Sequence, residues 1–182
     1  MQQESDDQAL IAQISEGSEV AMTRFYKAHE SRIYAFALKK VNDPHASADI
    51  VIETMMAVWT GAGSYKGTAK VSTWLFGIAH RKSIDVLRKR GRQETDELDF
   101  DIEDESSDFS LALEAIEDGA QLHQCIKALP AAQQEIVHLA FFEDLSYPEI
   151  SAITDCAEGT IKSRIFHAKS KLKQCVERLM RG

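Results

Sequence analysis

The residues best suited to chemistry gather in the last quarter of the chain, where hydroxyl and cationic side chains follow a tight turn. Ser146 and Glu149 have the spacing of a capping box around Pro148, which predicts the start of a short helix. Residues 154–156 then predict a turn, and a longer helix follows from residue 158. Two helices joined in this way are typical of a helix-turn-helix. The chemistry expected here is recognition of DNA base edges.

Base edges are recognised by donors and acceptors on the first turns of the recognition helix. Arg164 is expected to bond bidentately to guanine, whereas the nearby lysines are expected to meet phosphates. The alternative is a basic helix that is simply solvated. The residues predicted to contact DNA from this helix are Thr160, Lys162, Ser163, Arg164, His167 and Lys169.

The charge of the chain is distributed unevenly. The net charge is -8, but residues 94–118 contain twelve acidic residues and no Lys or Arg. Residues 66–92 contain eight cations against one acid, and residues 162–181 contain seven cations against one acid. Two basic blocks therefore flank an acidic segment, and the overall negative charge does not exclude a nucleic-acid partner.

Several classes of protein are excluded by the composition and motifs. No apolar run reaches the length of a membrane span, and the polar start does not predict a secretory signal. Cys125, Cys156 and Cys175 match no zinc spacing and are expected to be buried thiols in a reducing cytosol. No paired histidine ligands, phosphate-binding glycine loop or nucleophile motif is present. We therefore expect no enzyme activity, no metal or other cofactor, and no small-molecule substrate.

Helical periodicity dominates the chain. Asn42-Asp43-Pro44 predicts a break between two helices, and the glycines of residues 61–67 predict a loop. The predicted fold is all-α, with two small helical domains (1–92 and 116–182) joined by a flexible acidic linker (93–115). The predicted helices cover residues 7–14, 18–41, 45–60, 71–90, 111–129, 131–142 and the two helices of the helix-turn-helix.

Motifs along nearly the whole chain resemble those of one family. They are Asp6-Asp7-Gln8-Ala9-Leu10 with Phe25-Tyr26, Asp49-Ile50-Val51-Ile52-Glu53-Thr54 with Val58-Trp59, Tyr65-Lys66-Gly67 with Ser72-Thr73-Trp74-Leu75-Phe76-Gly77-Ile78-Ala79, and Leu129-Pro130 with residues 145–169. In this order and spacing they resemble the bacterial extracytoplasmic-function (ECF) sigma factors, group IV of the primary sigma factor family.

This resemblance implies an alternative sigma factor in the cytoplasm. The first domain would be sigma region 2, which binds core RNA polymerase and recognises and melts the minus-ten promoter element. The second domain would be sigma region 4, which reads the minus-thirty-five element. The resemblance also implies a stress or envelope regulon and an anti-sigma factor, often membrane-anchored, that holds the protein inactive. The chain itself is not expected to insert into a membrane.

The resemblance also assigns site residues in the first domain. Arg81 stands where the family often has Asn, and Ala48 and Ile52 stand where it often has an acid and a Gln. Tyr65 is equally compatible with stacking on a base or with core packing, and Ile50 with a partner or with the core. The residues expected at the minus-ten element are Tyr65, Lys66, Lys70, Thr73, His80, Arg81, Ser83 and Arg88. The residues expected to bind core polymerase are Asp49, Ile50, Glu53, Thr54 and Met56.

Two other kinds of protein remain as alternatives. A sigma mimic would bind an anti-sigma factor without touching DNA, but the two basic blocks oppose this reading. An ordinary helix-turn-helix repressor would dimerise on a palindrome, which leaves the whole first domain unexplained.

Overall fold

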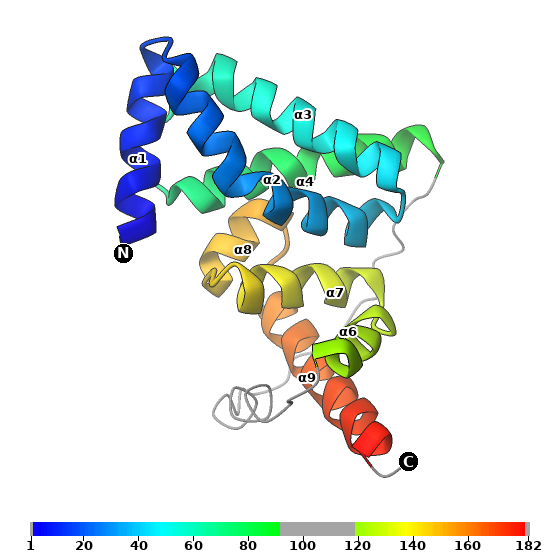
Figure 1. Ribbon diagram of the computed structural model, residues 1–182. Helices are drawn as coiled ribbons and strands as arrows, with labels where there is room; N and C mark the ends of the chain where they lie inside the picture. Colours follow the sequence, from blue (N-terminus) through cyan, green and yellow to red (C-terminus); the bar gives the residue numbers. More distant parts are fainter. Residues whose placement is uncertain (1, 92–118, 181–182) are drawn as a thin grey trace. The chain divides into compact units, whose positions relative to one another are not determined.

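The computed structural model describes residues 2–91 and 119–180, and all the regular structure in these two ranges is helical. We call the helical part before residue 92 the first unit and the part after residue 118 the second unit (Figure 1). The predicted all-α fold with two small domains is therefore confirmed. The predicted linker, residues 93–115, and the predicted helix start near residue 111 lie outside the described residues.

The first unit shows how local sequence sets its helix ends. Its elements are α1 (Gln2–Ser15), α2 (Glu19–Val41), α3 (Pro44–Gly61), the 3-10 turn η1 (Ala62–Ser64) and α4 (Val71–Lys89). Asn42 ends α2 in the left-handed conformation, with φ of 49°. The Asp43 carboxylate then accepts a hydrogen bond from the Ala46 N–H at 2.9 Å, and Pro44 begins α3. The predicted break between α2 and α3 is thus present.

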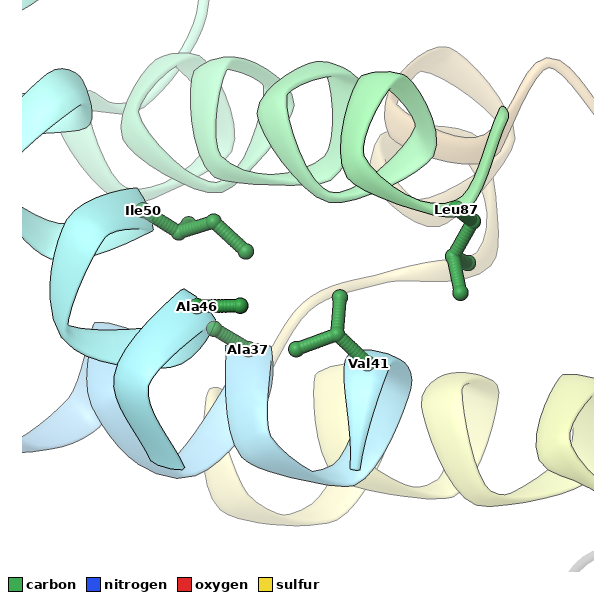
Figure 2. Close-up of a cluster of buried hydrophobic side chains, with 5 residues drawn as sticks. All are labelled: Ala37, Val41, Ala46, Ile50 and Leu87. Carbon is green, nitrogen blue, oxygen red and sulfur yellow. The ribbon is translucent and has the colours of Figure 1, made fainter. Parts of the chain in front are cut away.

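Helix α2 runs through the centre of the first unit, because it packs on α1, α3 and α4. The buried rings of Phe36 in α2 and Phe76 in α4 meet edge to face, with centroids 5.4 Å apart. Figure 2 shows a neighbouring part of this core, formed by Ala37, Val41, Ala46, Ile50 and Leu87. These contacts hold α3 and α4, which carry most of the predicted site residues of this unit, on one scaffold.

The second unit consists of α6 (Gly119–Lys127), α7 (Ala131–Val137), the π-helical turn η2 (His138–Phe142), α8 (Tyr147–Thr154) and α9 (Glu158–Met180). The sequence predicted one helix over residues 131–142, but its last five residues form the wider π turn. In this turn the Glu143 N–H donates to the His138 carbonyl at 3.3 Å. Phe141 and Phe142 are left 37% and 43% exposed.

The cysteines differ from the prediction of three buried thiols. Cys125 of α6 and Cys175 of α9 form a disulfide with their Cα atoms 5.8 Å apart, and Cys156 is free. The two partners are 50 residues apart in sequence and become neighbours because α6 packs on α9. Their spacing in the sequence could not reveal a pairing that the packing of two helices creates.

Candidate nucleic-acid interface

The first helix of the predicted helix-turn-helix begins with the expected capping box. The Glu149 carboxylate accepts hydrogen bonds from the backbone N–H of Ser146 at 2.8 Å and from its hydroxyl at 2.6 Å. Pro148 lies in the first turn of α8, where its missing N–H costs nothing. The predicted start of α8 is therefore confirmed, and these two hydrogen bonds join residues only three positions apart.

The turn between α8 and α9 is tight. Asp155 has the left-handed φ of 56°, and its N–H donates to the Ser151 carbonyl at 3.0 Å. The Ser151 hydroxyl donates to the Cys156 carbonyl at 2.6 Å, which ties the last turn of α8 to the start of α9. Asp155 thus fulfils the role that glycine often has at such a turn.

The exposed side of α9 carries cations and an aromatic ring. Lys162 is exposed, and Phe166, about one turn later, is 39% exposed. Thr160, His167 and Lys169 are half-buried. The Phe166 and His167 rings meet edge to face at 5.6 Å, and the Lys169 ammonium lies 5.9 Å from the centre of the Phe141 ring. This surface can meet phosphates through its cations and an apolar base edge through Phe166.

Two residues predicted to read DNA do not belong to this exposed surface. Ser163 is 1% exposed and Arg164 is 8% exposed. The Arg164 guanidinium is turned back to the helix-turn-helix turn, where Nη1 donates to Cys156 Sγ at 3.5 Å. The prediction is corrected accordingly: in this conformation Arg164 braces the turn, and it must leave Cys156 before it can reach a base.

In the first unit, the loop before α4 places an aromatic ring beside cations. The Tyr65 hydroxyl donates to the Ala69 carbonyl at 2.5 Å, and the Tyr65 ring lies 5.2 Å from the Trp74 ring. Gly67 has a positive φ of 69°, which lets the loop turn sharply. Lys66 and Lys70 are exposed in the same loop. A half-buried ring flanked by cations is suited to holding an unstacked base.

The residues predicted along α4 divide into two groups. Arg81 and Arg88 are exposed, and His80 is half-buried. Ser83 is fully buried, because the helical turn of about 100° per residue places it on the face with Ala79 and Leu87. Its hydroxyl donates to the Ala79 carbonyl at 2.8 Å, so its prediction as a DNA contact is corrected to an internal bond of α4. Thr73 is only 7% exposed.

The predicted polymerase contacts lie on two different faces of α3. Ile50 and Thr54, one turn apart, are 1% and 0% exposed, because this face of α3 packs on α2 and α4. Their side chains cannot meet a partner, and their prediction is corrected to a role in the core. Asp49, Glu53 and Met56 lie on the outward face, where Met56 is 63% exposed. Glu53 is 3.1 Å from the ammonium of Lys82 in α4.

A groove lies beside this outward face of α3. Its volume is about 310 Å³, and both tyrosines in its wall come from α2. A hydrogen bond to Glu30 raises the pKa of the Tyr26 phenol, and burial and the Glu30 charge raise it further. The groove can receive apolar side chains from a partner. Its lining consists of Tyr26, Glu30, Ser31, Tyr34, Ala48, Val51 and Ile52.

The sequence predictions missed two exposed apolar side chains, Phe166 and Ile52. Ile52 is 52% exposed at the edge of the groove, and Phe166 is 39% exposed on α9. A signal was available, because Ile161 and Ile165 define the buried side of α9, and the next residue along must turn about 100° away from it. A single exposed apolar residue is ordinary, but Ile52 borders the groove and Phe166 lies beside the cations of α9, so each belongs to a candidate contact surface.

Within residues 2–91 and 119–180, no group of three or more His, Cys, Asp or Glu side chains is placed to hold a metal ion. Among the helices in these ranges, none combines the length and apolarity that crossing a bilayer requires.

Comparison with protein families identifies both units. The family model described as Sigma-70 region 2 matches residues 25–93, and the model described as Sigma-70, region 4 matches residues 119–172. The two matches include the loop and α4 in the first unit and the helix-turn-helix in the second.

Curated relatives extend the similarity over the full chain. The chain is 32% identical to the ECF RNA polymerase sigma factor RpoE of Cereibacter sphaeroides over 157 residues, which cover 86% of each protein. It is 27% identical to the RNA polymerase sigma-H factor of Pseudomonas aeruginosa, with 98% of this chain and 97% of that protein covered. It is 29% identical to the ECF RNA polymerase sigma factor SigK of Mycobacterium tuberculosis, with 95% of each covered.

Solved structures share the fold. CnrH, solved in complex with the cytosolic domain of CnrY, matches with a TM-score of 0.65 and 21% identity over 95% of this chain and 98% of that one. The sigma factor RpoE of Bartonella quintana, solved with the anti-sigma factor NepR, matches with a TM-score of 0.63 and 25% identity over 85% of this chain and 96% of that one.

Proposed function

The chain belongs to the ECF RNA polymerase sigma factors, and from this premise we propose that it directs core polymerase to the promoters of a stress or envelope regulon. The observation that carries the proposal is a capped helix-turn-helix with an exposed basic and aromatic side, on the same chain as a helical unit with a basic loop. We propose domain boundaries of 1–92, 93–115 and 116–182. The protein acts in the cytoplasm, as a transcription initiation factor without a catalytic group of its own.

The second unit is proposed to read the minus-thirty-five element through α9. Lys162 and Phe166 are the exposed residues on its DNA-facing side, and His167 and Lys169 flank them. Phe166 is suited to the methyl group of a thymine, whereas the lysines are suited to phosphates. Arg164 contributes once its guanidinium has moved off Cys156.

The first unit is proposed to melt the minus-ten element at the loop before α4. Tyr65 offers a ring for a flipped base, and Lys66 and Lys70 offer charge for the phosphates beside it. The exposed Arg81 and Arg88 extend this basic surface along α4. Because guanidinium only donates hydrogen bonds, Arg81 favours bases that present acceptors.

Core polymerase is proposed to bind the outward face of α3. Asp49 and Glu53 offer negative charge, while Ile52 and Met56 offer apolar area beside the groove. An apolar patch that includes Met and has polar residues at its edge has the layout of a protein interface. Neither Ile50 nor Thr54 belongs to this contact.

We also infer that an anti-sigma factor holds the chain inactive. The sigma factor RpoE of Bartonella quintana was solved with such a partner. An anti-sigma factor that covers the groove or the basic loop would compete with polymerase or DNA. In this family such a partner is often anchored in the membrane.

A gel shift on cognate promoter DNA, with and without core polymerase, tests the proposal. A sigma factor should bind the promoter well only in the presence of core. Strong binding without core would identify a repressor, and no binding in either case would identify a sigma mimic. The promoter is found by sequencing transcripts after overexpression, since their aligned start sites define both elements.

Two variants separate promoter recognition by the second unit from core binding by the first. Arg164→Ala should lower run-off transcription while leaving core binding intact, and unchanged transcription would remove Arg164 from the site. Asp49→Ala should weaken core binding in a pull-down. The matched control is Asp85→Ala, another exposed acid of the first unit, which should bind core normally.

A further inference from the structure

The start of α4 has no cap of its own. The residue at its N-cap, Lys70, makes no side-chain capping hydrogen bond. The first N–H groups of any helix lack partners inside the helix, and they carry the positive end of the helix dipole. The loop that we assign to promoter melting ends at this point, so its position depends on how the first turn of α4 is held.

The missing cap comes from α1. Glu4 Oε1 accepts a hydrogen bond from the backbone N–H of Val71 at 2.7 Å, across 67 residues of sequence. A carboxylate suits this place, because it both accepts from an unpaired N–H and interacts favourably with the helix dipole. The Gln8 amide donates to the same Glu4 oxygen at 3.3 Å, which fixes the carboxylate from the next turn of α1.

The same two residues of α1 also reach the other end of the loop. Burial raises the pKa of the Tyr65 phenol, the nearby Glu4 charge raises it further, and the Gln8 side chain lowers it. Glu4 and Gln8 therefore act on Tyr65 and on Val71, the residues on either side of the exposed stretch 66–70.

Helix α1 is itself fixed against the rest of the first unit. Its Asp7 is buried and lies 3.0 Å from the buried His29 of α2, and Arg32 contacts the other ring nitrogen of His29 at 3.2 Å. Ile11 and Ile14 are each 2% exposed in the same core. Because Glu4 precedes Asp7 by about one turn, this anchoring holds the Glu4 side of α1 toward α4.

We propose that α1 positions the promoter-melting loop, with Glu4 as the positioning residue that caps α4 and Gln8 as the residue that holds the Glu4 carboxylate. The inference rests on the proposed function of this loop. Glu4 touches no DNA in this proposal. It sets where the loop and its aromatic ring stand when a base leaves the duplex, and it leaves the outward face of α3 unchanged.

The test uses full-length protein bound to core polymerase, with a single-stranded oligonucleotide of the mapped minus-ten element as the probe. Glu4→Ala should weaken binding of this strand about three- to tenfold, the loss expected for a missing cap, without changing the affinity for core. Glu4→Gln should restore most of the binding, because its amide oxygen can still accept from Val71. The matched control is Asp6→Ala, an exposed acid on the same helix, which should behave as wild type.

A spectroscopic readout separates positioning from general loss of stability. Ultraviolet titration, with Tyr65→Phe as the reference, should show a lower pKa of Tyr65 in Glu4→Ala. Equal losses of strand binding and core binding in Glu4→Ala would overturn the inference, as would strand binding equal to wild type. If the wild-type holoenzyme itself does not bind the strand, the proposed function of the loop fails first, and the inference fails with it.

Discussion

The two parts of the molecule that we propose to contact DNA begin their helices in different ways. In the second unit, α8 is capped by Glu149, which bonds to Ser146 three residues earlier. In the first unit, α4 is capped by Glu4, which lies 67 residues from Val71 in sequence. The helix-turn-helix therefore carries its own start, whereas the basic loop depends on a separate helix. A change in α1 can reach the loop, whereas the two capping bonds of α8 join residues only three positions apart.

The two units also differ in what holds their outer helices. Helix α6 is linked to α9 by the Cys125–Cys175 disulfide, whereas α1 is linked to α2 by the buried pair of Asp7 and His29. The disulfide is covalent and is broken by reductant. The contact between Asp7 and His29 is not covalent, and reductant leaves it unchanged. The comparison can thus be tested by treatments that affect one unit at a time.

Loss of the disulfide should have the largest effect, and only in the second unit. A crosslink that closes a loop of 50 residues stabilises by about 4 kcal/mol through the unfolded chain. Cys125→Ser, or treatment of wild type with dithiothreitol, should lower the free energy of unfolding of the second unit by about this amount. Urea unfolding followed by far-ultraviolet circular dichroism measures both units.

Tryptophan fluorescence gives the internal control for this experiment. The two tryptophans of the chain, Trp59 and Trp74, both lie in the first unit. Their unfolding transition should stay in place when the disulfide is removed, and Cys156→Ser should leave both signals unchanged. Identical circular dichroism curves with and without reductant would contradict the prediction.

Removal of Asp7 should act on the first unit alone. Asp7→Ala leaves the buried His29 without this hydrogen-bond partner, which should cost about 1–3 kcal/mol of unfolding free energy. The tryptophan transition in urea should move to lower concentration. Asp6→Ala, next to it but exposed, serves as the control. Equal midpoints for the two variants would show that the buried pair does not hold α1.

Truncation of Phe166 should weaken DNA binding without weakening the fold. Phe166→Ala removes an exposed ring from α9, so holoenzyme affinity for the minus-thirty-five element should fall about tenfold. Lys162→Ala should instead weaken binding to all DNA sequences by the same factor. It should also reduce the slope of log K against log salt concentration by about one. Filter binding over a salt series measures both. A Phe166→Ala protein with wild-type affinity would remove the ring from the interface.

The smallest effect is expected at Asp43, which caps α3 and meets Arg90 at the end of α4. The pKa of Asp43 is lowered chiefly by the hydrogen bond that its carboxylate accepts from the Ala46 N–H. The hydrogen bond from Arg90 Nη2 to Asp43 Oδ2, at 2.7 Å, lowers it further. A carboxyl with a lowered pKa stabilises the fold above its ordinary pKa and loses this contribution as the pH falls through its folded value. Asp43→Asn keeps a good cap but loses the charge. Its stability deficit should therefore shrink below a pH of about 4.

Fluorescence-detected urea unfolding of wild type and Asp43→Asn between pH 7 and pH 3 measures this difference. A deficit that stays constant down to the lowest pH would contradict the role of the Asp43 charge.

Features encoded within a few residues were predictable from the sequence. The break at Asn42 and the box of Ser146 and Glu149 are short-range hydrogen-bond patterns, and both occur as predicted. The all-α fold and the order of the two domains follow from periodicity and motif order. The cap by Glu4 was not predictable, because nothing in the sequence relates it to Val71 before the helices pack.

Site residues were predicted less well where helix rotation decides the outcome. Thr54 and Ser83 are small polar residues that suit a surface by type, yet both are fully buried. The sequence left two roles open for Ile50, a contact with a partner or a place in the core. The packing of α3 places it in the core. Phe166 was not among the predicted contacts, although its angle from Ile165 along α9 turns it out of the buried stripe.

The account is tested most directly by transcription in a purified system. Core polymerase is incubated with fragments of the genome that encodes this protein, with and without the chain, and the 5′ ends of the RNA are mapped. The account predicts start sites that appear only when the chain is added and that share two upstream sequence elements. Absence of any chain-dependent transcript from all fragments would contradict it.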